Sequence, residues 1–279
     1  MKVAVIGASG LLGKYLVREW KGDDVAGFSS KDVDIRDAGQ VNKLIERVRP
    51  DWILLAAAYT DVDGCESHQE LAFQTNCTGA VNLAQAARDH GSRLLFVSTD
   101  YVFDGANSTP YETDAPRNPR SIYGKSKAEA EVHIAEILLT SCIARTSWLF
   151  GVGGKCFPDT ILRLADARPE LQVVNDQRGS PTYARDLALA LVQLCRKNAQ
   201  GIVHVTNSGD CTWFEFAFEI IRQAGLKTVV QPTTTDKIPR LAPRPKYSVL
   251  SAKSLARYEI LMPAWQQALT NYLSERRQT

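Results

Sequence analysis

The first half of the chain alternates between short apolar runs and stretches with helical spacing. The apolar runs fall at residues 2–7, 24–30, 51–58, 93–100 and 141–151. Helical spacing of apolar side chains occupies residues 10–20, 38–48, 68–91 and 121–138. Continuous apolar strands separated by helices predict a parallel sheet that is buried on both faces. With right-handed connections, this pattern gives a doubly wound, Rossmann-like α/β fold.

After about residue 150 the alternation becomes less regular. Residues 155–197 predict a helix, a short strand, a turn and another helix, and residues 210–225 predict a further helix. Residues 231–250 are rich in proline and threonine, which favours a loop. We therefore expect a large domain over residues 1–150, completed by returning segments. The expected C-terminal part, residues 151–279, is a smaller α/β lobe that is not an independent domain.

Composition and charge narrow the class of protein. The 279 residues carry a net charge of +2 without a strongly basic run, so nucleic acid is not indicated as a partner. No stretch reaches the roughly 18 apolar residues of a membrane span, and the start has no signal-peptide layout. Six scattered cysteines indicate reduced thiols, and four isolated histidines do not predict a metal site. We expect a cytoplasmic protein without metal, membrane or nucleic-acid partner.

A glycine-rich turn follows the first apolar run. Gly7, Gly10 and Gly13 lie in the sequence GASGLLG, directly before the first helical stretch. The first glycine allows a tight turn, the second lets the backbone approach a pyrophosphate, and the third lets helix and strand pack closely. The helix N-terminus then favours the negative charge of the phosphates. This strand-loop-helix context predicts that residues 1–150 bind a dinucleotide.

The end of the second apolar run bears on which dinucleotide binds. NAD-specific versions of this fold usually place an acid there, which holds the adenosine ribose hydroxyls. Here the chain reads Phe28, Ser29, Ser30 and Lys31, without an acid. Two hydroxyls and a lysine would suit a 2′-phosphate, so we expect NADPH. A solvated polar loop that also accepts NADH is the alternative.

A tyrosine and a lysine lie four residues apart in the helical stretch 121–138. Tyr123 and Lys127 share one face of that helix, and the preceding apolar run ends in Thr99, within VSTD. A phenol beside an ammonium group and an oxidised nicotinamide should have a lowered pKa. Tyr123 could then exchange a proton with a carbonyl oxygen while Thr99 hydrogen-bonds that oxygen. Lys127 would also hold the nicotinamide ribose.

These motifs together resemble the extended short-chain dehydrogenase/reductases, and more narrowly the dTDP-4-dehydrorhamnose reductase family. The resemblance runs nearly end to end. It is carried by GASGLLG, AAAYTDVDGCE (56–66), VSTDYVFDG (97–105), NPRSIYGKSKAEAE (118–131), ARTSWLFG (144–151), DQRGSPTYARDLA (176–188) and PRPKYSVL (243–250). The blocks STDYVFDG and RTSWLFG are the most specific.

The resemblance implies a role for each matching residue. Thr99, Tyr123 and Lys127 match the catalytic triad of the family. The positions that would line the cofactor, together with Ser29, Ser30, Tyr123 and Lys127, are Gly7, Gly10, Leu11, Leu12, Asp34, Ile35, Ala56, Ala57, Ala58 and Tyr59. The positions around the substrate are Thr60, Val62, Thr99, Asp100, Tyr101, Tyr123 and Trp148.

Two of the implied roles have structural alternatives. Trp148 would form an apolar wall against the substrate, and its alternative is a core tryptophan. Asn76 would hold backbone near the catalytic tyrosine, and its alternative is a polar residue on a helix face. Arg240, Arg244 and Lys246 are candidates for contact with the substrate diphosphate, or a solvated charged loop.

The residue at position 101 separates this chain from related sugar-nucleotide enzymes. Similar 4,6-dehydratases have a glutamate there, and the epimerase-reductases have a cysteine. Tyr101 is not expected to take over the acid/base role of that glutamate or cysteine, because the ordinary pKa of a tyrosine suits this role poorly. The resemblance therefore implies an oxidoreductase of dTDP-rhamnose biosynthesis. It would reduce the C4 ketone of dTDP-4-dehydro-L-rhamnose to dTDP-L-rhamnose with NADPH or NADH, and Tyr123 would be the general acid.

Other readings stay open at this point. One is a reductase of another nucleotide-linked 4-keto-6-deoxysugar. A second is a non-catalytic, dinucleotide-binding regulatory subunit that resembles the methionine adenosyltransferase β subunit. A third is a UDP-sugar 4-epimerase, against which the missing acid after residue 28 counts modestly. The family resemblance also leaves a homodimer open, whereas no carboxylate set for an interface magnesium can be placed.

Overall fold

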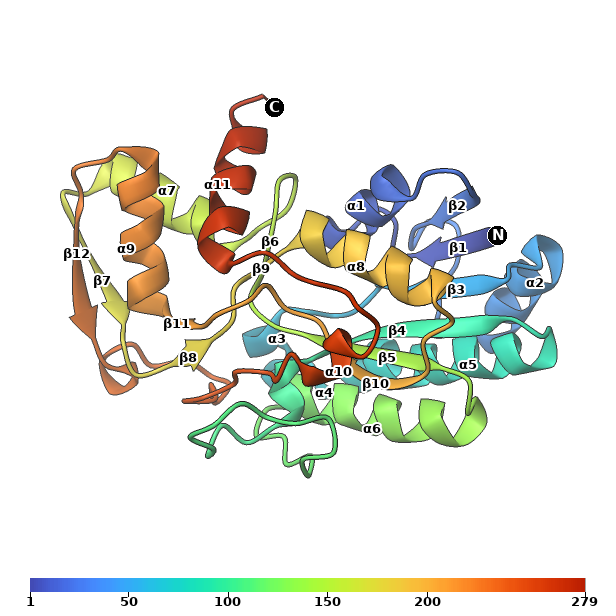
Figure 1. Ribbon diagram of the computed structural model, residues 1–279. Helices are drawn as coiled ribbons and strands as arrows, with labels where there is room; N and C mark the ends of the chain where they lie inside the picture. The colour runs from blue at the N-terminus through green and yellow to red at the C-terminus, as the bar shows by residue number, and fades with distance from the viewer. Residues whose placement is uncertain (279) are drawn as a thin grey trace.

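A six-stranded parallel sheet forms the centre of the larger part of the protein. The computed structural model describes residues 1–278. The strands, in spatial order, are β2 (Asp24–Phe28), β1 (Lys2–Ile6), β3 (Trp52–Leu55), β4 (Arg93–Thr99), β5 (Cys142–Thr146) and β10 (Gly201–His204). All neighbouring strands pair in parallel. The strand order reverses between β1 and β3, so the predicted doubly wound fold is confirmed (Figure 1).

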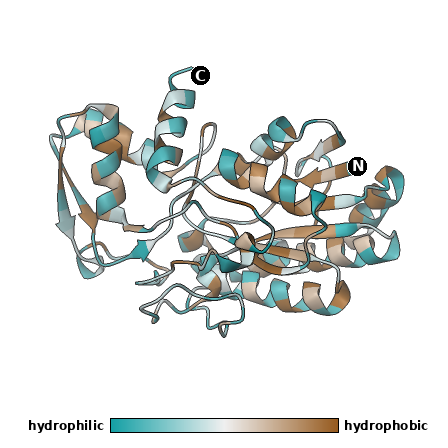
Figure 2. Ribbon diagram, viewed as in Figure 1, coloured by the Kyte–Doolittle hydropathy of each residue, from teal (hydrophilic) through white to brown (hydrophobic). Residues whose placement is uncertain are grey.

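Helices cover both faces of this sheet. On one face lie α1 (Leu11–Glu19) and α8 (Ala184–Arg196), and on the other α2 (Ala38–Val48), α5 (Gly79–Asp89) and α6 (Ile122–Ile137). Within β1, Val3 and Val5 join the first core, whereas Ala4 and Ile6 join the second. Successive side chains of a strand point to opposite faces, which explains why the strands are apolar throughout (Figure 2).

A smaller lobe lies beside the carboxyl edge of the sheet (Figure 1). It pairs β7 (Glu170–Val174) with β12 (Val229–Thr233), and α7 (Phe157–Ala167) packs on α9 (Trp213–Ala224). Two short pairs join the parts: β8 (Arg178–Gly179) with β11 (Cys211–Thr212), and β6 (Leu149–Phe150) with β9 (Thr182–Tyr183). The chain then forms η3 (Thr235–Lys237), α10 (Lys253–Ala256) and α11 (Trp265–Arg276).

The predicted helix over residues 68–91 is interrupted. It consists of α4 (Gln69–Phe73), a π-helical turn η1 (Gln74–Thr78) and α5. A π turn adds a residue to the helix, and such turns often lie at functional sites. Before it lies an unpredicted helix, α3 (Val62–Ser67), whose start is capped by Asp61, since the carboxylate accepts a hydrogen bond from the Gly64 amide.

Two further sequence predictions need correction. The predicted strand over residues 141–151 splits into β5 and β6, because Trp148 adopts a left-handed backbone conformation with φ +46°. The predicted loop over residues 231–250 begins inside β12, where Pro232 lies on an edge strand that tolerates proline. No helix among residues 1–278 is long and apolar enough to cross a membrane.

Candidate functional site

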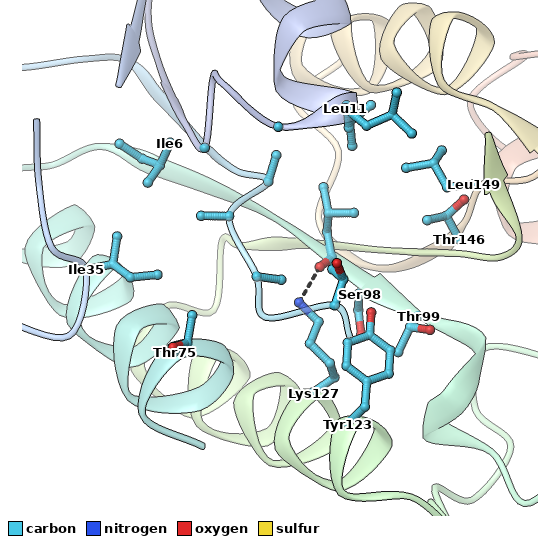
Figure 3. A pocket seen from close by; sticks show the side chains of 18 of the residues that line it. Ile6, Leu11, Ile35, Thr75, Ser98, Thr99, Tyr123, Lys127, Thr146 and Leu149 are labelled. Atoms are coloured by element: carbon cyan, nitrogen blue, oxygen red, sulfur yellow. Dashed lines mark hydrogen bonds between the residues drawn. The ribbon is translucent and has the colours of Figure 1, made fainter. Parts of the chain in front are cut away.

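A cleft of about 720 Å³ opens at the carboxyl ends of β1, β3, β4 and β5 (Figure 3). Ligands of open α/β sheets bind at this edge, beside the reversal of strand order. The predicted site residues that line the cleft are Gly7, Gly10, Leu11, Leu12, Ser29, Ser30, Asp34, Ile35, Ala56, Ala57, Ala58, Thr60, Val62, Thr99, Asp100, Tyr101, Tyr123, Lys127 and Trp148. The fold thus gathers nineteen predicted residues from distant segments into one cleft.

The glycine turn forms a cradle that fits a dinucleotide phosphate group. Gly7 has φ +93°, and a Cβ atom there would lie 2.5 Å from the backbone nitrogen of Ala57. A Cβ atom on Gly13 would lie 2.1 Å from the carbonyl oxygen of Gly7. The N-cap residue of α1 is Gly10, which has no side chain to cap the helix, so the first amides of α1 are available to an anion.

The adenosine end of the cleft contains more charge than the sequence indicated. Ser29 donates its hydroxyl hydrogen to Asp32 at 2.7 Å, so an acid does stand beside the second strand end. Asp34 pairs with Arg36, whose Nε and Nη2 donate to the carboxylate at 2.9 and 2.7 Å. Arg36 also lines the cleft, and sequence analysis missed it. It adds a cation to this end of the cleft, whereas Lys31 does not line the cleft.

The three proposed catalytic residues meet where β4 ends against α6. Figure 3 shows Tyr123 and Lys127 extending from α6 into the cleft, with the Tyr123 ring between Lys127 and Thr99. Lys127 is buried, with only 1% of its surface exposed, and Nζ donates to the Val97 carbonyl at 2.7 Å. Nζ also lies 3.9 Å from the ring centroid of Phe96. Burial lowers the pKa of Lys127 to about 7, and the charge of Glu131 opposes that shift.

Tyr123 differs from the sequence expectation in its protonation. Burial raises the pKa of Tyr123, and a hydrogen bond with Thr99 lowers it by less. Lys127 does not lower the pKa of this phenol in the structure, since burial dominates. A phenol that stays protonated at neutral pH can donate a proton to a developing alkoxide. This state suits reduction of a ketone.

Trp148 is both a cleft residue and a packing residue. It lines the cleft, and its ring stacks on Trp213 of α9 with centroids 3.5 Å apart. A Cβ atom on Gly179 would lie 2.5 Å from the Trp148 ring. The ring is therefore held between α9 and β8. Trp148 thus packs like a core residue and also lines the cleft. Trp213 had no signal in the sequence, since its role depends on tertiary contact.

Tyr59 is the one predicted cofactor residue that does not line the cleft. Its hydroxyl lies over Gly64, where an added Cβ atom would be 2.6 Å away. Asn76 holds the Tyr59 backbone at both ends, since Oδ1 accepts from N at 2.7 Å and Nδ2 donates to O at 3.1 Å. Asn76 Nδ2 also donates to Ser126 Oγ at 3.0 Å. Asn76 thus joins the loop after β3 to α6, beside Lys127.

The predicted phosphate-binding loop makes other contacts. Arg244 Nη2 lies 2.8 Å from Asp63 Oδ2, and Arg240 Nη1 lies 3.7 Å from the same oxygen. Neither arginine nor Lys246 lines the cleft. Lys155, between β6 and α7, does line it and is exposed. This lysine gives no signal in the sequence, because its loop reaches the cleft only in the folded chain.

Ten further residues line the cleft without having been predicted, and most of them lie next to a predicted residue in the chain. They are Ile6, Ser9, Val33, Leu71, Thr75, Val97, Ser98, Thr146, Ser147 and Leu149. Several of them close or follow a strand, and that position alone could have identified them.

Comparison with known proteins gives consistent matches along the chain. The family model described as RmlD substrate binding domain matches residues 1–278. The chain is 42% identical over 277 residues to the spore coat polysaccharide biosynthesis protein SpsK of Bacillus subtilis (strain 168), covering 99% of this chain and 98% of that one. It is 37% identical over 286 residues to a dTDP-4-dehydrorhamnose reductase of Aggregatibacter actinomycetemcomitans, covering 97% of each.

A solved structure agrees with these matches. The dTDP-4-dehydrorhamnose reductase of Bacillus anthracis strain Ames, in complex with NADP, superposes with a TM-score of 0.96 at 39% identity. The match covers 99% of this chain and 100% of that one.

Proposed function

Because the chain belongs to the dTDP-4-dehydrorhamnose reductase (RmlD) family, we propose that it uses NADPH to reduce dTDP-4-dehydro-L-rhamnose to dTDP-L-rhamnose. The observation that carries this proposal is the meeting of Thr99, Tyr123 and Lys127 in one cleft behind the glycine turn. When bound, the reduced nicotinamide supplies a hydride to C4 of the sugar. The side chains of the chain supply the proton and the orientation.

Tyr123 gives its hydroxyl proton to the C4 oxygen, so that the ketone becomes an alcohol. The Thr99 hydroxyl donates to Asp100 Oδ1 at 3.0 Å without substrate and turns this hydrogen to the C4 oxygen as negative charge develops there, which stabilises the transition state. Lys127 keeps one hydrogen on the Val97 carbonyl and has two further hydrogens for the nicotinamide ribose. The low exposure of Lys127 and Thr99 keeps water from competing for these hydrogen bonds.

The cofactor and the sugar nucleotide occupy different parts of the cleft in this proposal. Gly7, Gly10 and the alanines after β3 bind the dinucleotide, and Arg36 together with Ser30 receives its 2′-phosphate. Residues 1–150 with their returning segments form the cofactor domain, and residues 151–279 form the substrate lobe. Thr60, Val62, Asp100, Tyr101 and Trp148 surround the sugar and its nucleotide.

Lys155 contacts the diphosphate of the sugar nucleotide in this proposal. It lines the cleft, whereas Arg240 and Arg244 face Asp63. Its ammonium group is exposed and can approach a charged ligand at little desolvation cost. The protein would work in the cytoplasm, where its substrate and cofactor are found. A homodimer stays a prediction.

The test is oxidation of NADPH and NADH, followed by absorbance, with a panel of nucleotide-linked 4-keto-6-deoxysugars. The proposal expects turnover with dTDP-4-dehydro-L-rhamnose, a preference for NADPH, and dTDP-L-rhamnose as the product. Faster turnover of another 4-keto-6-deoxysugar would transfer the assignment to that substrate. Tight NADPH binding without any turnover would favour the non-catalytic regulatory subunit instead.

A further inference from the structure

A buried carboxylate lies behind the catalytic residues and has no part in the chemistry above. Glu131 lies on α6 one turn beyond Lys127 and is 0% exposed. Its Oε1 accepts hydrogen bonds from Ser98 Oγ at 2.6 Å and Arg145 Nε at 2.9 Å. Its Oε2 accepts from Arg145 Nη2 at 2.6 Å and Arg117 Nε at 2.7 Å. Three side chains thus bind both carboxylate oxygens.

These partners belong to the elements that carry the reaction. Ser98 directly precedes Thr99 at the end of β4. Arg145 lies on β5, three residues before Trp148. Glu131 itself lies on α6, which carries the proposed acid and its lysine. We propose that Glu131 is a positioning residue that fixes the carboxyl ends of β4 and β5 against α6, and so places Thr99 and Lys127 with its own negative charge one helical turn from the Lys127 ammonium. This inference rests on the proposed function.

The charge of Glu131 has a second effect, on Lys127. The ammonium contacts the Val97 carbonyl and the Phe96 ring, neither of which carries a charge. Burial disfavours the protonated lysine, and Glu131 favours it. If the carboxylate only filled space, an apolar side chain of similar volume would serve as well. The negative charge of Glu131, one helical turn from the buried ammonium, stabilises the protonated lysine, which an apolar side chain would not do.

Other titratable groups surround this cluster without replacing Glu131. Arg145 Nη1 lies 3.3 Å from His204 Nε2 on β10, and burial with Arg145 lowers the pKa of His204 to about 4, so it is neutral at working pH. The other titratable groups on α6 and on the elements packed against it are Asp63, Cys65 and Glu66 on α3, Glu70 on α4, Cys77 on η1, Arg88 and Asp89 on α5, Arg93 on β4, Asp100 and Tyr101 on η2, and Tyr123, Lys125, Glu129, His133 and Glu136 on α6, with Glu112 in the loop before it.

The test compares two variants with opposite electrostatic effects. Glu131→Gln keeps the shape but leaves Arg117 and Arg145 uncompensated, so Lys127 should lose its proton at lower pH. We expect the alkaline limb of kcat to move down by about one pH unit, and kcat at neutral pH to fall about tenfold. Glu129→Gln is the matched control, because Glu129 lies on the same helix but is exposed. Its profile should equal that of the wild type.

Arg117→Met provides a variant that the fold should tolerate. The Arg117 side chain is 29% exposed, and its loss leaves Glu131 less compensated. The alkaline limb should then move up. A purely structural role would lower kcat in both variants without moving the two limbs in opposite directions. If Glu131→Gln fails to fold, an unmoved limb in Arg117→Met alone overturns the proposal.

The affinity for NADPH, measured by fluorescence across the same pH range, separates this proposal from the proposed function. Lys127 is expected to hold the cofactor ribose, so the affinity should follow the same opposite shifts even without turnover. Wild-type protein that binds NADPH but reduces no sugar nucleotide would refute the proposed function alone. Wild-type turnover with unmoved limbs in both variants would refute the role of Glu131 alone.

Discussion

Two buried oxygen atoms along the cleft have no hydrogen-bond partner among residues 1–278. They are Asp100 Oδ2 and Thr146 Oγ1, and both residues line the cleft. Leaving a buried polar atom unpaired costs about 1–3 kcal/mol, so these atoms are candidates for contacts that a ligand completes. Sugar hydroxyls and amide groups of a cofactor are partners of the right kind.

Asp100 should show this in the pH dependence of stability. Burial raises the pKa of Asp100 to about 6, from an ordinary value of 3.8. The folded protein therefore holds this proton to higher pH than the unfolded chain, and stability falls as pH rises through that window. Asp100→Asn removes the titration. The melting temperature of the variant minus that of the wild type should therefore increase by a few degrees as the pH rises from about 4 to about 7.

A constant difference in melting temperature across this range would contradict the burial argument. The same variant should raise KM for the sugar nucleotide and leave NADPH affinity nearly unchanged, as equilibrium titration of both ligands can show.

Gly179 should control the position of Trp148. A Cβ atom at this position overlaps the Trp148 ring at 2.5 Å, and Trp213 blocks the other face of that ring. Gly179→Ala should therefore displace the ring and raise KM for the sugar nucleotide about tenfold, with NADPH affinity within twofold of wild type. Gly39→Ala, on α2 away from the lobe, is the control. Unchanged KM in Gly179→Ala would mean that Trp148 does not contact the substrate.

At the scale of single residues, the sequence identifies those site residues that belong to a motif of neighbouring positions. The glycine turn and the Tyr123–Lys127 pair are recognised from neighbouring positions, and all of their residues except Ala8 and Gly13 line the cleft. Arg36, Lys155 and Trp213 were missed because their roles arise from contacts between distant segments. The sequence predicted a lowered pKa for Tyr123 beside Lys127 and an oxidised nicotinamide, whereas burial, which is not visible in a sequence, raises this pKa in the structure.

At the scale of elements, the π turn η1 connects two parts of the site. Asn76 lies in this turn and makes three hydrogen bonds to Tyr59 and Ser126. Because the side chain is 1% exposed, its loss leaves buried groups on two elements unpaired. Removing it should loosen the loop after β3 and α6 together.

Asn76→Ala should lose about 2–4 kcal/mol of unfolding free energy and lower kcat about tenfold at a temperature where it remains folded. Asn207→Ala is a matched control, since Asn207 is also 1% exposed and makes three hydrogen bonds, to Tyr183, Asp186 and Pro263, none of which lines the cleft. We expect a similar loss of stability from the control in urea denaturation, with kcat close to wild type. Equal kcat losses in both would reduce Asn76 to a stabilising residue.

Periodicity predicted every strand of the first half but not where elements are interrupted. The turn at residues 74–78 and the left-handed Trp148 break patterns that look continuous in the sequence. Both interruptions are held by tertiary contacts, from Asn76 to another loop and from Trp148 to α9. Local propensity therefore gives the element and misses the break.

At the scale of the whole molecule, the C-terminal helix α11 ties the sheet domain to the lobe. Glu275 on α11 accepts hydrogen bonds from Tyr15 at 2.7 Å and Arg18 at 2.5 Å, both on α1. It also accepts one from Tyr183 on β9. Length, composition and charge indicate the class of protein. They do not predict contacts between the two ends of the chain.

Glu275→Gln should lower the unfolding free energy by about 1–3 kcal/mol, since three donors lose a charged acceptor. Glu219→Gln is the control, because Glu219 pairs with Arg222 within the single helix α9. The two should be compared by urea denaturation. A loss in the control as large as in Glu275→Gln would show that the tie adds nothing beyond an ordinary surface pair.

The central claim is that Tyr123 donates the proton to the sugar ketone, and Tyr123→Phe tests it most directly. Its matched control is Tyr101→Phe, since the Tyr101 ring lies 5.7 Å from that of Tyr123 in the same cleft. Both variants should bind NADPH like the wild type. Turnover of dTDP-4-dehydro-L-rhamnose should fall at least about a hundredfold in Tyr123→Phe and far less in Tyr101→Phe. Near-normal turnover in Tyr123→Phe would contradict the account.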